Sequence, residues 1–253
     1  MHDVAHRTID VHDFISKSYD RSPRPARIEA GLLFSLLIFS ALILVFGLIA
    51  EEAMEGDTTA FDRRVLLLFR ATTDPGRLLG PVWIPEALRD VTSLGSVVVL
   101  STVVLTVLGY LAITRNRYAF ISVLSAVLSG QIISTGLKFL FERARPDLIP
   151  GAPHVFTASF PSGHAMLSAV TYLTLGAMLS RLEQRRATKI YLMAVAVTLT
   201  IIVGISRVAL GVHWPTDVLA GWCVGSAWAL VCTTIIARFD LRPTDVVEIK
   251  DSQ

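Results

Sequence analysis

Two histidines and an aspartate in this chain have the residue types and spacing that phosphoryl transfer uses. His213 and Asp217 are four residues apart, which is about one helical turn, so their side chains can meet. An imidazole attacks phosphorus through an unprotonated ring nitrogen, and a carboxylate on its other nitrogen fixes that tautomer. The second histidine, His164, can protonate the leaving oxygen as a general acid. These residues predict a histidine nucleophile, His213, oriented by Asp217 and assisted by His164.

Three cations can supply the positive charge that a transferred phosphoryl group needs around its oxygens. Lys138 and Arg145 are seven residues apart, and Pro146 follows them. If a helix continues to that proline, the two cations share one helix face about 10 Å apart. Arg207 adds a second guanidinium, whose forked donors match the geometry of a phosphate group.

The run Pro161-Ser162-Gly163-His164 predicts the start of a helix that can bind an anion. Ser162 stands at the expected N-cap, and Gly163 leaves the backbone N–H groups of the first turn open to a ligand. We therefore expect the Ser162 side chain and the Gly163 N–H to donate hydrogen bonds to phosphate oxygens.

The composition of the chain and its apolar blocks are those of a membrane protein. The 253 residues are 53% hydrophobic and 17% charged, whereas a soluble domain carries about a quarter charged residues. A block of about 20 apolar residues spans a bilayer as a helix. The predicted fold class is an all-α membrane protein with six transmembrane helices in one bundle. The expected spans are about 31–50, 94–113, 118–141, 164–182, 190–205 and 215–237.

These spans divide the chain into an N-terminal arm (1–30), a six-span domain (31–237) with a long outer loop (51–93), and a tail (238–253). Cytoplasmic loops of membrane proteins carry an excess of Lys and Arg. The arm, the tail and the segments 114–117 and 181–189 all carry such residues and fall on one side of a six-span bundle. We therefore expect both termini in the cytoplasm and the protein in the cell inner (cytoplasmic) membrane. The outer loop has five arginines, but eight acidic residues offset them.

All of the candidate residues fall at the outer ends of the expected spans, with Lys138 about one turn deeper. Charge at membrane depth is costly unless it pairs or lines a cavity. Three cations, two histidines and a helix N-terminus at one level predict a phosphate pocket on the periplasmic or extracellular side.

Each residue taken alone has a plainer interpretation. Lys138 could pair with Glu142, four residues later, or extend to the membrane interface. Arg145 and Arg207 could be interfacial anchors, and Ser162 could be a helix cap and nothing more. A histidine or an aspartate at a helix start often satisfies local hydrogen bonds or interacts with the helix dipole. Their joint placement on one side of the membrane favours the pocket.

Several other features have a structural interpretation. Cys223 and Cys232 are nine residues apart, which in a helix is too far for a disulfide. The pattern Gly221-x-x-x-Gly225 predicts close helix packing inside the bundle, so the sequence assigns no oligomeric state. Residues 75–85 suit either a segment on the membrane surface or a loop that packs on the bundle. No His, Cys or carboxylate set has metal-ligand spacing, so we expect no metal and no cofactor.

The motifs together resemble the three-part signature of the type 2 phosphatidic acid phosphatases (PAP2), a superfamily that includes vanadium haloperoxidases and bacterial acid phosphatases. The pattern is Lys138-x6-Arg145-Pro146, Pro161-Ser162-Gly163-His164 and Ser206-Arg207-x5-His213-x3-Asp217. The resemblance implies a phosphohistidine at His213, orientation by Asp217 and acid catalysis by His164. It also implies that the phosphate is held by five residues: Lys138, Arg145, Ser162, Gly163 and Arg207.

The resemblance implies an integral membrane lipid phosphatase that acts at the outer face of the membrane on a lipid phosphate or diphosphate. The substrate enters from the bilayer, and undecaprenyl diphosphate is the first candidate, before phosphatidate, phosphatidylglycerophosphate or lipid A phosphate. A lipid phosphotransferase would use the same site. A transporter of a phosphorylated lipid or anion is an alternative, but transport would not need two histidines and Asp217. A haloperoxidase is disfavoured because those relatives are soluble, whereas this chain has the composition of a membrane protein. The net charge of +2, without a basic aromatic cluster, gives no indication of nucleic acid binding.

Overall fold

The computed structural model describes residues 25–72, 74–147 and 157–240. The chain divides into two compact units, Met1–Leu37 and Ile38–Gln253. Of the first unit, the structure describes only residues 25–37, which are the first turns of a helix. The bundle and the site described below belong to the second unit.

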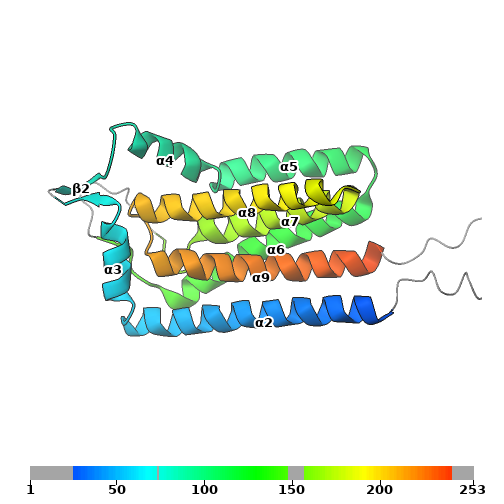
Figure 1. Ribbon diagram of the computed structural model, residues 1–253, viewed down its shortest axis with the longest axis horizontal. Coiled ribbons are helices and arrows are strands. Elements are labelled where there is room, and N and C mark those ends of the chain that lie inside the picture. Colours follow the sequence, from blue (N-terminus) through cyan, green and yellow to red (C-terminus); the bar gives the residue numbers. More distant parts are fainter. Residues whose placement is uncertain (1–24, 73, 148–156, 241–253) are drawn as a thin grey trace, which may run out of the picture. The chain divides into compact units, whose positions relative to one another are not determined.

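The described residues form eight helices and one two-stranded hairpin (Figure 1). In chain order they are α2 (Pro25–Glu55), α3 (Thr59–Leu67), β1 (Arg70–Ala71), β2 (Asp74–Leu78), α4 (Ile84–Ser93), α5 (Val97–Ile113), α6 (Arg117–Phe141), α7 (Gly163–Leu182), α8 (Arg186–Ala209) and α9 (Pro215–Asp240). Helices α2, α6, α7, α8 and α9 are each long and apolar enough to cross a membrane. The pair α4–α5, bent by 42°, passes the same test as a single broken span. The predicted all-helical membrane fold is confirmed.

Helix α7 is the centre of the bundle. It packs most extensively on α8 and α9 and also contacts α5 and α6. The G-x-x-x-G pattern of α9 makes the α7–α9 contact close. A Cβ at Gly225 would lie 2.5 Å from the Met166 carbonyl oxygen, and one at Gly221 would lie 2.8 Å from the Ser162 carbonyl oxygen. The pattern therefore packs inside the bundle, and it holds the first turns of α7 and α9, which carry candidate residues, against each other.

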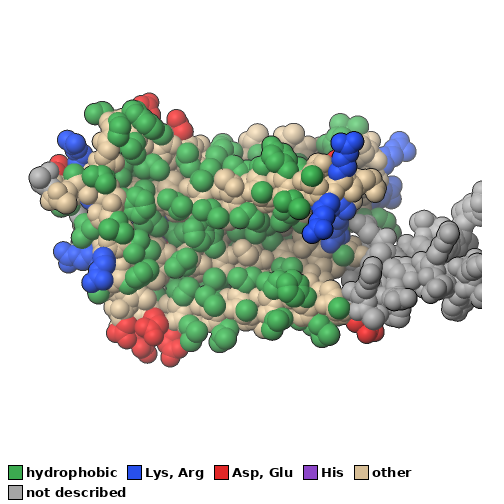
Figure 2. Space-filling view, in the orientation of Figure 1, with side chains coloured by type: hydrophobic (Ala, Val, Ile, Leu, Met, Phe, Trp, Pro, Cys, Tyr) green, Lys and Arg blue, Asp and Glu red, His purple; other side chains and the backbone are tan. Residues whose placement is uncertain are grey.

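The outer faces of the helices carry large apolar side chains. Leu105 of α5 is 66% exposed, and Ile132 and Phe139 of α6 are 72% and 76% exposed. Figure 2 shows hydrophobic side chains along the middle of α8 and α9, with Lys, Arg, Asp and Glu gathered toward the helix ends. So much exposed apolar surface is costly in water and favourable in lipid. The protein is a multi-pass membrane protein.

The segment 51–93, which was expected from the sequence to be a loop, contains regular structure. It contains α3, which contacts α9, the β1–β2 hairpin, and α4, which packs on α8. The hairpin is antiparallel and pairs Arg70 with Leu78. Part of the segment 75–85 is thus a strand, whereas the sequence suggested either a surface segment or a loop. The longer segment 51–93 also places α3 in contact with α9.

Helix α6 ends earlier than the position of Pro146 suggested. Its last residue is Phe141, because Glu142 adopts a left-handed conformation (φ 41°) and donates its N–H to the Lys138 carbonyl oxygen at 3.2 Å. A left-handed residue of this kind closes a helix. The prediction that Lys138 and Arg145 share one helix face is therefore wrong. Arg145 lies in the irregular segment that follows α6, and its side chain reaches the turn before α9, where it contacts Val212 and His213.

Candidate active site

The imidazole of His213 and the carboxylate of Asp217 meet at the start of α9. His213 lies in the turn between α8 and α9, and its Nδ1 is 3.3 Å from Asp217 Oδ2. Asp217 is in the first turn of α9, where its Oδ2 also accepts the Trp214 N–H at 2.9 Å. An acid that reaches back to the N–H before its own helix stabilises the helix start. The same carboxylate therefore caps α9 and orients the imidazole.

Arg145 identifies the tautomer of His213. Its Nη1 lies 3.1 Å from His213 Nε2, and a guanidinium can only donate hydrogen bonds. His213 Nε2 must then accept, which leaves the ring proton on Nδ1, facing Asp217. The imidazole is neutral in this arrangement, and the lone pair of Nε2 is directed at the guanidinium. This is the tautomer that a nucleophilic histidine requires.

Arg145 is held by contacts on both sides of its guanidinium. Nε donates to the Thr157 carbonyl oxygen at 2.9 Å, and Nη2 donates to the Thr157 hydroxyl at 3.1 Å. Nη1 also donates to the Val212 carbonyl oxygen at 2.7 Å. The guanidinium therefore lies beside His213 with its orientation determined by two segments distant in sequence.

The N-terminus of α7 lies next to this pair. The Ser162 N–H donates to the Asp217 carbonyl oxygen at 2.9 Å, and Ser162 is the N-cap of α7, as predicted. Its Oγ is buried, caps no backbone N–H and has no hydrogen-bond partner among the described residues. An unpaired buried hydroxyl is costly, and a bound anion would satisfy it together with the first N–H groups of the helix.

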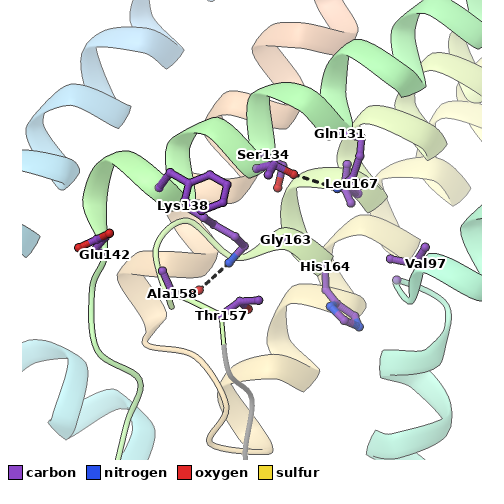
Figure 3. Close-up of a pocket in the computed structure, with 13 residues that line it drawn as sticks. Val97, Gln131, Ser134, Lys138, Glu142, Thr157, Ala158, Gly163, His164 and Leu167 are labelled. Atoms are coloured by element: carbon purple, nitrogen blue, oxygen red, sulfur yellow. Dashed lines mark hydrogen bonds between the residues drawn. The ribbon is translucent and has the colours of Figure 1, made fainter.

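Lys138, Gly163 and His164 line a cavity of about 570 Å³ beside this N-terminus (Figure 3). Lys138 Nζ donates to the Ala158 carbonyl oxygen at 2.7 Å, whereas the alternative partner, Glu142, forms no ion pair within the described part of the chain. A Cβ at Gly163 would lie 3.5 Å from Lys138 Cε, so the lysine passes directly over the helix start. The other lining residues come from the α4–α5 turn, α5, α6 and the residue after it, the segment before α7, and α7: Gly95, Val97, Gln131, Ser134, Thr135, Phe139, Glu142, Thr157, Ala158 and Leu167.

Arg207 approaches the same region from the last turn of α8. It is 9% exposed, and its Nη1 donates to the Thr92 hydroxyl at 3.2 Å. Its Nε is buried without a partner among the described residues. Thr92 precedes the α4–α5 turn at Gly95, whose position lies close to the His164 side chain. Arg207 and His164 are therefore brought near each other by the same turn.

The structure thus places all eight predicted residues at one end of the bundle. Arg145 contacts His213, His213 contacts Asp217, and the Ser162 N–H is bonded to the Asp217 backbone. Lys138, Gly163 and His164 line one cavity, and Arg207 approaches from α8, bonded to Thr92. Sequence reasoning did not identify four polar residues that surround Asp217. Ser159 donates its hydroxyl to Asp217 Oδ2, and Arg143, Thr216 and Asp62 form a buried network behind it. The Arg-x-Arg spacing before Pro146 was the only sequence signal for any of them.

Burial determines the protonation of His213. Its side chain is 2% exposed, and burial lowers its pKa to about 4, with Asp217 opposing this shift and Arg145 adding to it. The imidazole is therefore expected to stay neutral as the pH falls through 6.5 and to become a cation only near pH 4. We expect an NMR titration of labelled histidine, with His213→Gln identifying the resonance, to show this low midpoint. A midpoint near 6.5 in the folded protein would contradict the buried, neutral imidazole.

Comparisons with known proteins identify the family to which this fold and these motifs belong. The PAP2 superfamily profile matches residues 119–240, which include every candidate residue. Phosphatidylglycerophosphatase B of Bacillus subtilis is 32% identical over 151 residues, covering 58% of this chain and 73% of that protein. Decaprenylphosphoryl-5-phosphoribose phosphatase of Mycobacterium tuberculosis is 30% identical over 135 residues, covering 52% of this chain and 70% of that protein.

A solved structure extends the likeness to most of the bundle. The crystal structure of a transmembrane PAP2 type phosphatidylglycerolphosphate phosphatase from Bacillus subtilis superposes with a TM-score of 0.66 at 26% identity. The match covers 83% of this chain and 98% of that one. With both sequence and fold shared, this chain belongs to the PAP2 superfamily and is a membrane phosphatase that hydrolyses phosphoric monoesters or diphosphates.

Proposed function

We propose that the protein removes phosphate from a lipid phosphate or diphosphate at the outer face of the membrane, through a phosphohistidine at His213. One observation carries the proposal: His213 Nε2 lies 3.1 Å from the Arg145 guanidinium, which can only donate hydrogen bonds, while Asp217 faces Nδ1. A guanidinium beside the nucleophilic nitrogen is where a phosphate oxygen would bind. The phosphorus atom would then lie within reach of the lone pair.

In the first step the Nε2 lone pair attacks phosphorus, and the bond between phosphorus and the leaving oxygen breaks. His164 gives its proton to that oxygen. His213 then carries both the phosphoryl group and the Nδ1 proton, so its ring is cationic and the buried Asp217 carboxylate stabilises it. In the second step His164 takes a proton from water, the water oxygen bonds to phosphorus, and the P–N bond breaks to return the electron pair to Nε2.

The phosphate oxygens need charge and donors while this happens. Lys138, Arg145 and Arg207 supply three positive charges, and Ser162 and the Gly163 N–H supply hydrogen bonds. Ser162 Oγ and Arg207 Nε have no hydrogen-bond partner within the part of the chain that the structure describes. A bound phosphate would pair both groups, which supports these assignments.

The lipid would reach this site from the side of the bundle. The cavity is walled by Val97, which is 64% exposed, and Phe139, which is 76% exposed, on the lipid-facing surfaces of α5 and α6. An acyl or prenyl chain could remain in the bilayer while its phosphate contacts Lys138. Undecaprenyl diphosphate is our first candidate, and the relatives named above extend the choice to phosphatidylglycerophosphate.

The orientation proposed is both termini in the cytoplasm, with the protein in the inner membrane. Helix α6 has 25 residues, so its ends are about 37 Å apart, enough to cross the bilayer. Lys138 is near one end, and Arg117 with the basic 114–117 turn is at the other. Basic turns favour the cytoplasm, which leaves the site outside.

Phosphate release from a panel of lipids by the purified protein in detergent tests this function. We expect turnover of at least one lipid phosphate or diphosphate, undiminished in excess EDTA because no proposed step uses a metal ion. No phosphate release from any lipid would refute the hydrolase. Loss in EDTA that a divalent metal restores would refute the metal-free mechanism, and radiolabel that moves into a second lipid would indicate a phosphotransferase.

A further inference from the structure

Arg143 bridges two buried carboxylates behind the candidate nucleophile. Its Nη1 lies 2.7 Å from Asp217 Oδ1, and its Nη2 lies 2.8 Å from Asp62 Oδ2. Both carboxylate side chains are fully buried, and the Arg143 side chain is 10% exposed. Asp62 comes from α3 in the outer segment and Asp217 comes from α9, so the guanidinium joins two elements far apart in sequence.

The orientation of Arg143 is determined by further contacts. Nη1 also donates to the Thr216 hydroxyl at 2.8 Å, and Nη2 donates to the Thr58 hydroxyl at 3.0 Å. Its guanidinium carbon lies 5.8 Å from the centre of the Trp214 ring, within cation–π range. Asp62 is held in turn by Thr216, whose N–H and hydroxyl donate to it at 3.0 and 2.7 Å.

The two oxygens of Asp217 consequently have separate partners. Oδ1 accepts from Arg143, while Oδ2 accepts from Trp214 and Ser159 and faces His213 Nδ1. Because Arg143 holds Oδ1, the carboxylate group cannot rotate to exchange the positions of Oδ1 and Oδ2. We propose that Arg143, held by Asp62, is a positioning residue that keeps Asp217 Oδ2 directed at His213; this rests on the proposed nucleophilic role of His213.

Asp62 also balances charge in this arrangement. Arg143 alone beside Asp217 would neutralise the carboxylate and weaken its attraction for a cationic phosphohistidine. With Asp62 as a second acidic partner, Arg143 is neutralised by Asp62, and a net negative charge remains at Asp217. The triad of Asp62, Arg143 and Asp217 therefore fixes the carboxylate without removing the charge that the intermediate needs.

Steady-state kinetics of Arg143→Ala in the full-length protein test the proposal. We expect kcat to fall by about 10- to 100-fold, by analogy with residues that orient the ligands of a metal site. KM should stay within about threefold, because Arg143 does not line the cavity. Arg143→Lys, which keeps the charge, should recover part of the loss. The matched control is Arg64→Ala, which removes an exposed arginine of α3 and should leave kcat unchanged.

A double-mutant cycle separates positioning from a general structural role. If Arg143 acts through Asp217, Arg143→Ala should cost less than about threefold when Asp217→Asn is already present. An equal loss in both backgrounds, an unchanged kcat, or a rise in KM without a fall in kcat would overturn the positioning role. Should Arg143→Ala fail to fold in detergent, Arg143→Lys and Asp62→Asn replace it in the same cycle. More than a few per cent of wild-type turnover in His213→Ala would instead refute the proposed nucleophile, independently of Arg143.

Discussion

Replacement of His213 by alanine is expected to lower turnover of the lipid substrate by about 10⁴-fold or more, since no covalent intermediate can form without the nucleophile. The loss should fall on kcat. The cations that hold the phosphate remain, so a non-hydrolysable lipid phosphonate should still raise the thermal midpoint of the variant in detergent. Phosphate release with radiolabelled lipid provides the sensitivity that such a loss requires.

The phosphonate serves as the control for this variant. A variant that binds the phosphonate but does not hydrolyse the lipid substrate has lost the catalytic step while its phosphate pocket remains intact. Retention of more than a few per cent of wild-type turnover in purified His213→Ala would remove His213 from the nucleophile role.

His164→Ala should give a large effect that depends on the leaving group. A lipid alcohol leaves as a strong base and needs a proton, so we expect a loss of about 10²- to 10⁴-fold with a lipid phosphomonoester. A lipophilic aryl phosphate releases a phenol with a pKa of about 10, which leaves more readily. For that substrate the loss should shrink to about tenfold or less.

The comparison with His213→Ala makes this result interpretable, because loss of the nucleophile should abolish turnover of both substrates alike. Equal losses for the two substrates in His164→Ala would assign His164 to phosphate binding rather than to acid catalysis.

The sequence was sufficient to predict the membrane helices and the end of the bundle at which the polar residues meet. Long apolar blocks identify spans without any tertiary information, because the bilayer requires continuous backbone hydrogen bonding. The positions of the residues at the starts of α7 and α9 were predictable because the residue types that begin a helix are recognised from a few neighbouring positions in the sequence. Ser162 is at the N-cap of α7, and Asp217 is in the first turn of α9, as that chemistry indicated.

The partners of Arg143 were not predictable in the same way. Asp62 is 81 residues away in sequence and Asp217 is 74 residues away, and no local pattern connects them. The end of α6 was misjudged for a different reason. Glu142 is not a residue type that favours the left-handed conformation, so only the later proline signalled a stop. The early end matters, because it releases Arg143 and Arg145 to reach opposite ends of the His213–Asp217 pair.

Rapid acid-free quenching of the enzyme with lipid substrate labelled in its terminal phosphate tests the central claim most directly. The mechanism predicts a transient phosphoenzyme that survives base and is lost in acid, with the label on the peptide that contains His213 and absent from His213→Ala. Label on another residue, or phosphate release by the wild-type protein with no phosphohistidine at any time during turnover, would contradict it.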